Sequence, residues 1–179
     1  VTLPTHLCLR SRTGVVIRLT SSGISEDDVP YPAQRDDVDA AIAFLDRERE
    51  RFGIVDAPLV TWGVSAGGQL AALRALTDSD VRACALWYAA TDLRTMPAFP
   101  VDGGPSREHR VMGGTPEELP EIYAEASPVS HVSSDNPPFL LLHGDQDQAV
   151  PATQSYTMHD ALTRVGARST LEVIEGYDH

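Results

Sequence analysis

Leu59-Val60-Thr61-Trp62-Gly63-Val64-Ser65-Ala66-Gly67 joins a predicted strand to a predicted helix through a sharp turn. Its first four residues are apolar or β-branched, which favours a buried strand. The chain then runs through Gly63 into the Ala- and Leu-rich segment 66–76, which predicts a helix. Gly63 and Gly67 remove side chains that would collide where strand and helix pack together. The segment therefore predicts a strand–turn–helix unit with Ser65 at the turn.

Outward from this unit, strands and helices are predicted to alternate. Further apolar strands are expected at 15–19, 83–88, 139–142 and 170–174. Helical spacing of apolar residues occurs at Val38, Ala41, Ile42 and Leu45, with Gly53 as the end of the helix, and again at Met158, Ala161, Leu162 and Val165. Apolar strands separated by helices are typical of a mostly parallel sheet with helices on both faces. The sequence therefore predicts the α/β class, with strand 15–19 at an exposed edge of the sheet.

One segment breaks the alternation. From Thr91 to Pro138 the chain contains eight prolines, at 97, 100, 105, 116, 120, 128, 137 and 138, too many for an ordinary crossover helix. Thr115-Pro116-Glu117-Glu118 has a capping-box pattern and predicts one short helix. We expect residues 1–179 to form part of one domain, with an otherwise irregular insertion over about 92–137.

The composition of the 179 residues excludes several classes of protein. Lysine is absent, which rules out sites that need a lysine amine, such as a P-loop or a pyridoxal Schiff base. The net charge of −12 disfavours nucleic acid and anionic membrane surfaces as partners. The apolar runs fall far short of the ~18 residues needed to span a bilayer. Cys8 and Cys84 have no metal or redox spacing, and Cys84, in the apolar run 83–87, is expected to be a buried free thiol.

Gly63-Val64-Ser65-Ala66-Gly67 matches the G-x-S-x-G pattern of a nucleophile elbow. A serine hydroxyl is a poor nucleophile unless a base removes its proton and a third group orients that base. Asp147 follows the predicted strand 139–142, and His179 follows the predicted strand 170–174. The carboxyl ends of parallel strands share one edge of a sheet, so we expect Ser65, Asp147 and His179 to meet there.

The sequence offers other residues for the same roles. Asp145 lies in the same loop as Asp147, but an aspartate at this position also forms turns, so Asp147 is preferred as the acid. His143 is expected to be a structural hydrogen-bonding residue. His109, His131 and His159 are expected to be solvated or locally bonded, and His6 precedes the predicted strands altogether. No H-E-x-x-H or Cys/His ligand spacing occurs, so we expect no metal and no cofactor.

Several motifs together resemble the α/β-hydrolase superfamily, and within it the short-chain esterases. The stretch 31–37, Phe52-Gly53-Ile54 and the elbow with its doubled glycine are similar to segments of those enzymes. The stretches 126–132 and 137–147, followed by Val150-Pro151 and Gln154-Ser155, resemble the bifunctional feruloyl and acetyl esterase group, which includes acetylxylan-esterase-like enzymes. The resemblance covers about residues 14–179 and implies Ser65 as nucleophile, Asp147 as acid and His179 as base.

The oxyanion hole is the point where the sequence departs from this group. Such esterases carry a His-Gly-Gly loop whose backbone N–H groups bind the oxyanion, and no such run precedes Val15. The backbone N–H of Ala66 is one expected donor. We therefore expect the chain to be part of a longer hydrolase. Because losing one oxyanion donor costs ~10²–10³ in rate, we also expect weak activity from these residues alone.

The function expected from the sequence is hydrolysis of short acyl esters, acetyl or feruloyl-type, on a small-molecule or carbohydrate-linked substrate. A serine peptidase of the prolyl-oligopeptidase type and a non-catalytic interaction module are the alternatives. The apolar residues Met96, Phe99 and Met112 of the insertion are explained equally as pocket walls or as packing anchors. Acyl specificity, localisation and oligomeric state are left open.

Overall fold

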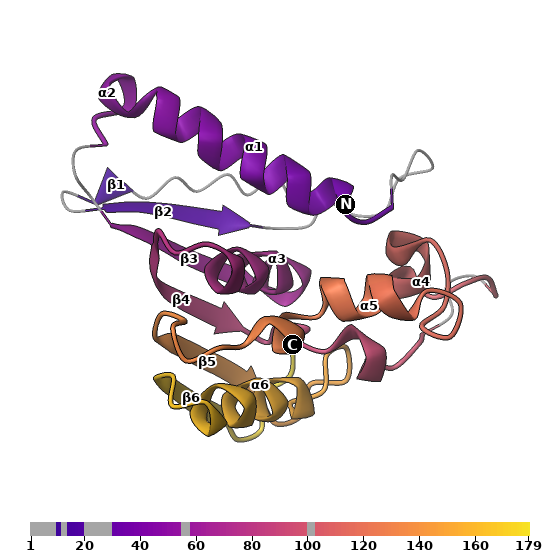
Figure 1. Ribbon diagram of the computed structural model, residues 1–179. Helices are drawn as coiled ribbons and strands as arrows, with labels where there is room; N and C mark the ends of the chain where they lie inside the picture. The colour runs from indigo at the N-terminus through magenta and orange to yellow at the C-terminus, as the bar shows by residue number, and fades with distance from the viewer. Residues whose placement is uncertain (1–9, 12–13, 20–29, 55–57, 100–102) are drawn as a thin grey trace.

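The fold is organised around one sheet, seen in a computed structural model that describes residues 10–11, 14–19, 30–54, 58–99 and 103–179 (Figure 1). Its strands are β1 (Arg10–Ser11), β2 (Gly14–Leu19), β3 (Leu59–Val64), β4 (Val81–Trp87), β5 (Phe139–Gly144) and β6 (Ser169–Ile174). Neighbours in the sheet follow chain order. Strands β2 to β6 pair in parallel, and β1 is antiparallel to β2. The predicted α/β class with a mostly parallel sheet is confirmed.

The long helices occur where apolar periodicity predicts them. The described helices are α1 (Ala33–Arg47), α2 (Arg49–Phe52), α3 (Ser65–Thr77), α4 (Arg107–Met112), α5 (Pro120–Ala126) and α6 (Thr153–Arg164), with 3-10 turns η1 (Leu93–Thr95) and η2 (Pro128–His131). Gly53 ends α2 in the left-handed conformation, at φ 64°. Glycine adopts that conformation without the steric penalty of a side chain, which explains why the helical segment stops there.

The core lies between α3, α6 and one face of the sheet. Cys84, Phe139 and Leu141 project from β4 and β5 onto this face and are buried. Met158 and Leu162 of α6, together with the small residues Ala71, Ala72 and Ala75 of α3, cover them. Small side chains on α3 let this helix pack close to the strands. Helix α3, which begins at Ser65 and is called the elbow helix below, therefore packs closely on the sheet.

The opposite face carries Trp62, Trp87 and Leu140, which alternate with the core residues along the strands. The Trp62 and Trp87 rings pack edge to face, 5.0 Å apart. Trp87 and Leu140 are 37% and 44% exposed. The expectation of helices on this second face stays a prediction.

Two local predictions are wrong. Strand β2 is not at the edge of the sheet, because Arg10 and Ser11 pair with Val15 and Gly14 and form β1. The capping box does form, since Thr115 Oγ1 accepts from Glu118 N and Glu118 Oε2 accepts from Thr115 N. It closes only a turn, however, and the helix begins at Pro120. Pro120 has no N–H to continue the preceding turn but suits the first position of a new helix.

The insertion is less irregular than the proline count suggests. Ser106 caps the start of α4 by accepting a hydrogen bond from His109 N, and Gly113 ends that helix at φ 85°. Met112 is buried against Tyr123, so it anchors the segment, whereas Phe99 is 50% exposed. The prolines thus separate short helices instead of preventing them.

The parallel register brings the ends of β3, β4, β5 and β6 to the same edge of the sheet, where the predicted site residues lie (Figure 1). None of the helices in the described part of the chain combines the length and apolar character that crossing a membrane requires.

Candidate active site

Ser65 stands at a strained turn between β3 and α3. Its φ is 52°, in the left-handed region that residues with side chains rarely adopt. The turn is possible because Gly63 has no side chain. A Cβ at this position would lie 2.3 Å from Gly67 O. The strand end and the helix start therefore pack directly against each other, and Ser65 is presented at the edge of the sheet.

His179 bridges the serine and an aspartate. Its Nε2 lies 2.9 Å from Ser65 Oγ, and its Nδ1 lies 2.7 Å from Asp147 Oδ2. A carboxylate only accepts hydrogen bonds, so Nδ1 carries the proton of the neutral imidazole, and Nε2 is free to accept the hydroxyl proton of Ser65. The His179 side chain is 29% exposed, whereas the Asp147 side chain is fully buried. This arrangement can transfer a proton from the hydroxyl to the imidazole.

Asp147 is held on both of its oxygens. Oδ1 accepts hydrogen bonds from the backbone N–H groups of Ala149 and Val150, each at 2.8 Å. Oδ2 faces His179. Buried carboxylates need such partners because desolvation without them is costly. The loop after β5 therefore supplies the donors that hold a charged acid inside the protein.

His143 forms a second contact with the same carboxylate. The residue is 0% exposed, and its Nε2 lies 2.8 Å from Val150 O and 3.3 Å from Asp147 Oδ2. Both of these groups accept, so Nε2 is the protonated nitrogen and Nδ1 accepts from the Ser155 hydroxyl at 2.7 Å. The expected structural role of His143 thus has a specific form, which is to tie β5, α6 and the Asp147 loop together.

The loops that carry Asp147 and His179 are bonded to each other. Gln146 N donates to Tyr177 O at 2.9 Å, and Asp145 Oδ1 accepts from Gly176 N at 2.7 Å. Gly144 allows this approach, because a Cβ there would lie only 2.2 Å from Tyr177 O. The distance between His179 and Asp147 consequently depends on a glycine at position 144.

The structure brings together Ser65, Asp147 and His179 as the sequence predicts, and it places Asp145 elsewhere, on the turn at Gly176. His159 bonds Ser169 Oγ and His131 bonds Glu125 O, both away from Ser65. The backbone N–H of His109 bonds Ser106. His6 lies outside the described residues.

Ala66 occupies the first turn of α3. The first N–H groups of a helix have no partner within the helix, and the helix dipole favours negative charge at this end. The position suits the donor role that the sequence predicts for Ala66.

The described residues contain no group of three or more His, Cys, Asp or Glu side chains placed to hold a metal ion. Cys84 is a buried free thiol, as predicted, and burial raises its pKa to about 12. Cys8 lies outside the described residues.

The interpretation of the sequence missed two contributors to this geometry. One is Gly144, where the absence of a side chain allows the close approach of Tyr177. Tyr88 was not singled out, and its ring lies 4.4 Å from the His179 imidazole. Its location directly after β4, next to the elbow strand, was the available signal.

A parallel sheet with a serine elbow after one strand and its partner residues after two later strands defines an α/β-hydrolase. The BD-FAE family model matches residues 23–162, and the chain belongs to this family.

Known relatives agree with this class. Esterase LipQ of Mycobacterium tuberculosis is 35% identical over 150 residues, which cover 76% of this chain and 36% of LipQ. A solved structure, the truncated form of a carbohydrate esterase from gut microbiota, superposes with a TM-score of 0.76 at 25% identity, covering 84% of this chain and 62% of that one. A puromycin-hydrolyzing peptidase of Mycobacterium tuberculosis gives a TM-score of 0.65 at 26% identity, over 80% of this chain and 22% of the other. The chain thus spans about a third of the length of LipQ.

Proposed function

We propose that the protein is a serine carboxylic-ester hydrolase in which Ser65, His179 and Asp147 form the catalytic triad. The observation that carries the proposal is the double contact of His179, at 2.9 Å from Ser65 Oγ and 2.7 Å from Asp147 Oδ2. The esterase relatives support the reaction type.

In the first half of the reaction, Ser65 Oγ attacks the acyl carbonyl of the ester while His179 Nε2 takes the hydroxyl proton. The negative charge on the carbonyl oxygen is stabilised by the N–H of Ala66. His179 then gives its proton to the departing alcohol oxygen, and the acyl group remains bonded to Ser65. Asp147 keeps the imidazole in the required tautomer and compensates its positive charge.

In the second half, water repeats the attack. His179 takes one proton from the water as its oxygen bonds to the acyl carbon, and returns that proton to Ser65 Oγ when the acyl-enzyme bond breaks. The products are a carboxylic acid, an alcohol and the regenerated serine. No step requires a metal or a cofactor.

The substrate class we propose is a short acyl ester, acetyl or feruloyl-type, on a small-molecule or carbohydrate-linked alcohol. The similarity to a protein described as a carbohydrate esterase favours the carbohydrate-linked form. Initial rates on p-nitrophenyl acetate, methyl ferulate and acetylated xylan distinguish these substrates. The proposed preference is wrong if none of the three is hydrolysed faster than a long-chain ester.

The test of the triad uses the full-length protein with Ser65→Ala, and Ser130→Ala as a matched control at an exposed serine. We expect Ser65→Ala to abolish p-nitrophenyl acetate hydrolysis and labelling by a fluorophosphonate probe, while Ser130→Ala retains both. Parental hydrolysis by Ser65→Ala would contradict the assignment. Absence of labelling in the parent would favour a non-catalytic module.

A serine peptidase of the prolyl-oligopeptidase type is the second candidate, because a solved peptidase shares this fold at 26% identity. The same triad attacks amides and esters, so geometry alone does not separate them. A comparison of kcat/KM for an acetyl ester with kcat/KM for a prolyl amide distinguishes an esterase from a peptidase. We expect the ester to be strongly preferred.

A further inference from the structure

Tyr88 lies beside Ser65 at the end of the neighbouring strand. The register of β3 and β4 pairs Val64 with Trp87, so Ser65 and Tyr88 occupy equivalent positions directly after the two strands. Both have positive φ, 52° for Ser65 and 41° for Tyr88, and among the described residues they are the only non-glycine ones that do. A positive φ is unusual for a bulky aromatic residue. Such strain persists only where the surrounding structure imposes it, and it clusters at functional sites.

The strained backbone directs the Tyr88 ring onto His179. The two ring centres lie 4.4 Å apart with the planes tilted by 56°. His179 lies in the loop after β6 with its side chain 29% exposed, and the two polar contacts of that side chain restrain only the ring nitrogens. The Tyr88 ring adds a ring-to-ring contact with the imidazole, beyond those two polar contacts.

The segment that presents Tyr88 is fixed from both sides. Tyr88 N donates to Leu142 O of β5 at 2.7 Å. The next residue, Ala89, is buried against Gly68 of the elbow helix, where an added Cβ would lie 2.5 Å from Ala89 Cβ. The main chain around Tyr88 is therefore packed against the elements that carry Ser65 and Asp147.

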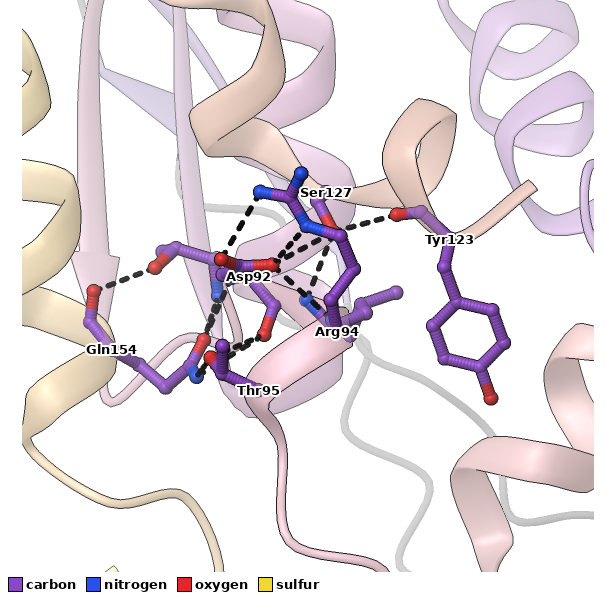
Figure 2. Close-up of polar contacts among 8 residues, drawn as sticks. Asp92, Arg94, Thr95, Tyr123, Ser127 and Gln154 are labelled. Carbon is purple, nitrogen blue, oxygen red and sulfur yellow. Dashed lines mark hydrogen bonds and ion pairs between the residues drawn. The ribbon is translucent and has the colours of Figure 1, made fainter. Parts of the chain in front are cut away.

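The side-chain amide of Gln154, at the start of α6, hydrogen-bonds the residues that follow Tyr88 (Figure 2). We call this set of hydrogen bonds the Gln154 clamp. Gln154 Oε1 accepts from Thr91 N and Asp92 N at 2.8 and 2.7 Å. Its Nε2 donates to Asp92 O at 3.2 Å and to Thr95 Oγ1 at 3.0 Å. The amide is buried and uses both of its donors and both acceptor positions. The segment after Tyr88 is thus tied to the helix that also contacts His143.

Figure 2 also shows a second group of bonds in this segment, in which the Asp92 carboxylate accepts hydrogen bonds from Arg94 and Ser127. Arg94 Nε and Nη2 donate to the two Asp92 oxygens at 2.7 and 3.1 Å. Ser127 Oγ accepts from Leu93 N at 2.9 Å and donates to Tyr123 O at 2.6 Å. These bonds leave little freedom for the backbone that follows β4.

We propose that Tyr88 is a positioning residue that holds the His179 imidazole between Ser65 and Asp147. Its strained backbone, locked by β5, Gly68 and the Gln154 clamp, presents the ring to the imidazole. The inference rests on the proposed function, because it assigns His179 the role of the base.

The test compares Tyr88→Phe, Tyr88→Leu and Tyr88→Gly in the full-length protein. Phe keeps the ring, Leu keeps an apolar side chain and the backbone strain without a ring, and Gly removes both the ring and the strain. Because a misplaced catalytic group costs on the order of 10²-fold, we expect the Leu and Gly variants to lose roughly 10- to 100-fold in kcat on p-nitrophenyl acetate. KM is expected to change little, and Tyr88→Phe is expected to stay close to the parent. Tyr156→Leu, at an exposed tyrosine on α6, is the control and should be unaffected.

A spectroscopic readout separates positioning from a general loss of structure. The downfield proton resonance of the hydrogen bond between His179 Nδ1 and Asp147 should be sharp in the parent and in Tyr88→Phe, and broadened in Tyr88→Leu and Tyr88→Gly. Because Tyr88→Gly relieves the strained φ, its melting temperature should be higher than that of Tyr88→Leu. Both variants should nevertheless lose kcat. A structural role alone predicts that kcat and melting temperature fall together.

Two results would overturn the inference. One is a parental kcat in Tyr88→Leu, and the other is an equal loss in Tyr88→Phe, which would assign the effect to the hydroxyl. These results are distinct from a failure of the proposed function, which would appear as parental activity in Ser65→Ala.

Discussion

Asp147 Oδ2 lies 2.7 Å from His179 Nδ1 and 3.3 Å from His143 Nε2, so one carboxylate oxygen faces two histidines. The first histidine is partly exposed beside Ser65, and the second is buried beneath the loop. Because the two imidazoles approach the same oxygen from different elements, changes at any of the three residues are expected to affect the other two.

Asp147→Asn should reduce kcat on p-nitrophenyl acetate by on the order of 10³–10⁴-fold, because an amide in place of the carboxylate favours the wrong tautomer of His179. Asp145→Asn is the matched control from the same loop, where the side chain only accepts a hydrogen bond from Gly176 N. The kcat of Asp145→Asn should stay within about tenfold of the parent value, because one exposed hydrogen bond contributes about 1 kcal/mol. A larger loss in Asp145→Asn than in Asp147→Asn would reverse the assignment of the acid.

His143→Gln should lower both stability and activity. The glutamine amide cannot replace all the buried contacts with Ser155 Oγ, Val150 O and Asp147. Leaving one buried polar group unsatisfied costs about 1–3 kcal/mol, measured as a fall in the free energy of unfolding. His159→Gln is the comparison, because His159 is only half-buried and bonds a single hydroxyl. Equal effects at the two positions would show that the buried network has no special role.

Gly144→Ala should move apart the two loops that carry Asp147 and His179. Its Cβ would fall 2.2 Å from Tyr177 O, so the segment that leads to His179 must move. A shift of about 1 Å in a catalytic group lowers kcat on the order of 10²-fold, and fluorophosphonate labelling of Ser65 should slow in parallel.

The control for that substitution is Gly166→Ala, at φ 83° with open space around the added methyl. Backbone strain should lower its melting temperature, but kcat should be retained because Gly166 is far from the site in the fold. Retained kcat in Gly144→Ala would refute the steric argument.

Cys84 should be unreactive in the folded protein at neutral pH. Burial raises its thiol pKa from the ordinary value of 9.0 to about 12, and the thiolate is the reactive form. In a Cys8→Ser variant, a disulfide reagent should modify Cys84 only after denaturation.

The same shift sets a pH dependence of stability. Since the folded state favours the neutral thiol, the contribution of Cys84 to stability is fully present below pH 9 and is lost as the pH rises from about 9 to about 12. Fast modification of the folded protein at pH 7 would contradict the burial of this residue.

Much of the fold could be predicted because it depends on local patterns. The apolar run before Gly63 and the small residues after Ser65 specify a strand and a helix within one short segment. The insertion was harder to predict from the sequence, because its many prolines suggest irregular structure. A helix nevertheless forms among the prolines, with Ser106 capping its start and Gly113 ending it. The pairing of Arg10 with Val15 depends on two residues and has no periodic signal.

The sequence by itself determined which residues stand at the strand ends, and hence the candidates Ser65, Asp147 and His179. Only the tertiary structure decided which side chains support them. Tyr88 against His179, His143 on Asp147 and Gly144 beneath Tyr177 are contacts that the register of β3 to β6 creates. A one-residue change in that register would turn the Tyr88 and His143 side chains to the opposite face of the sheet, and no local pattern encodes the register.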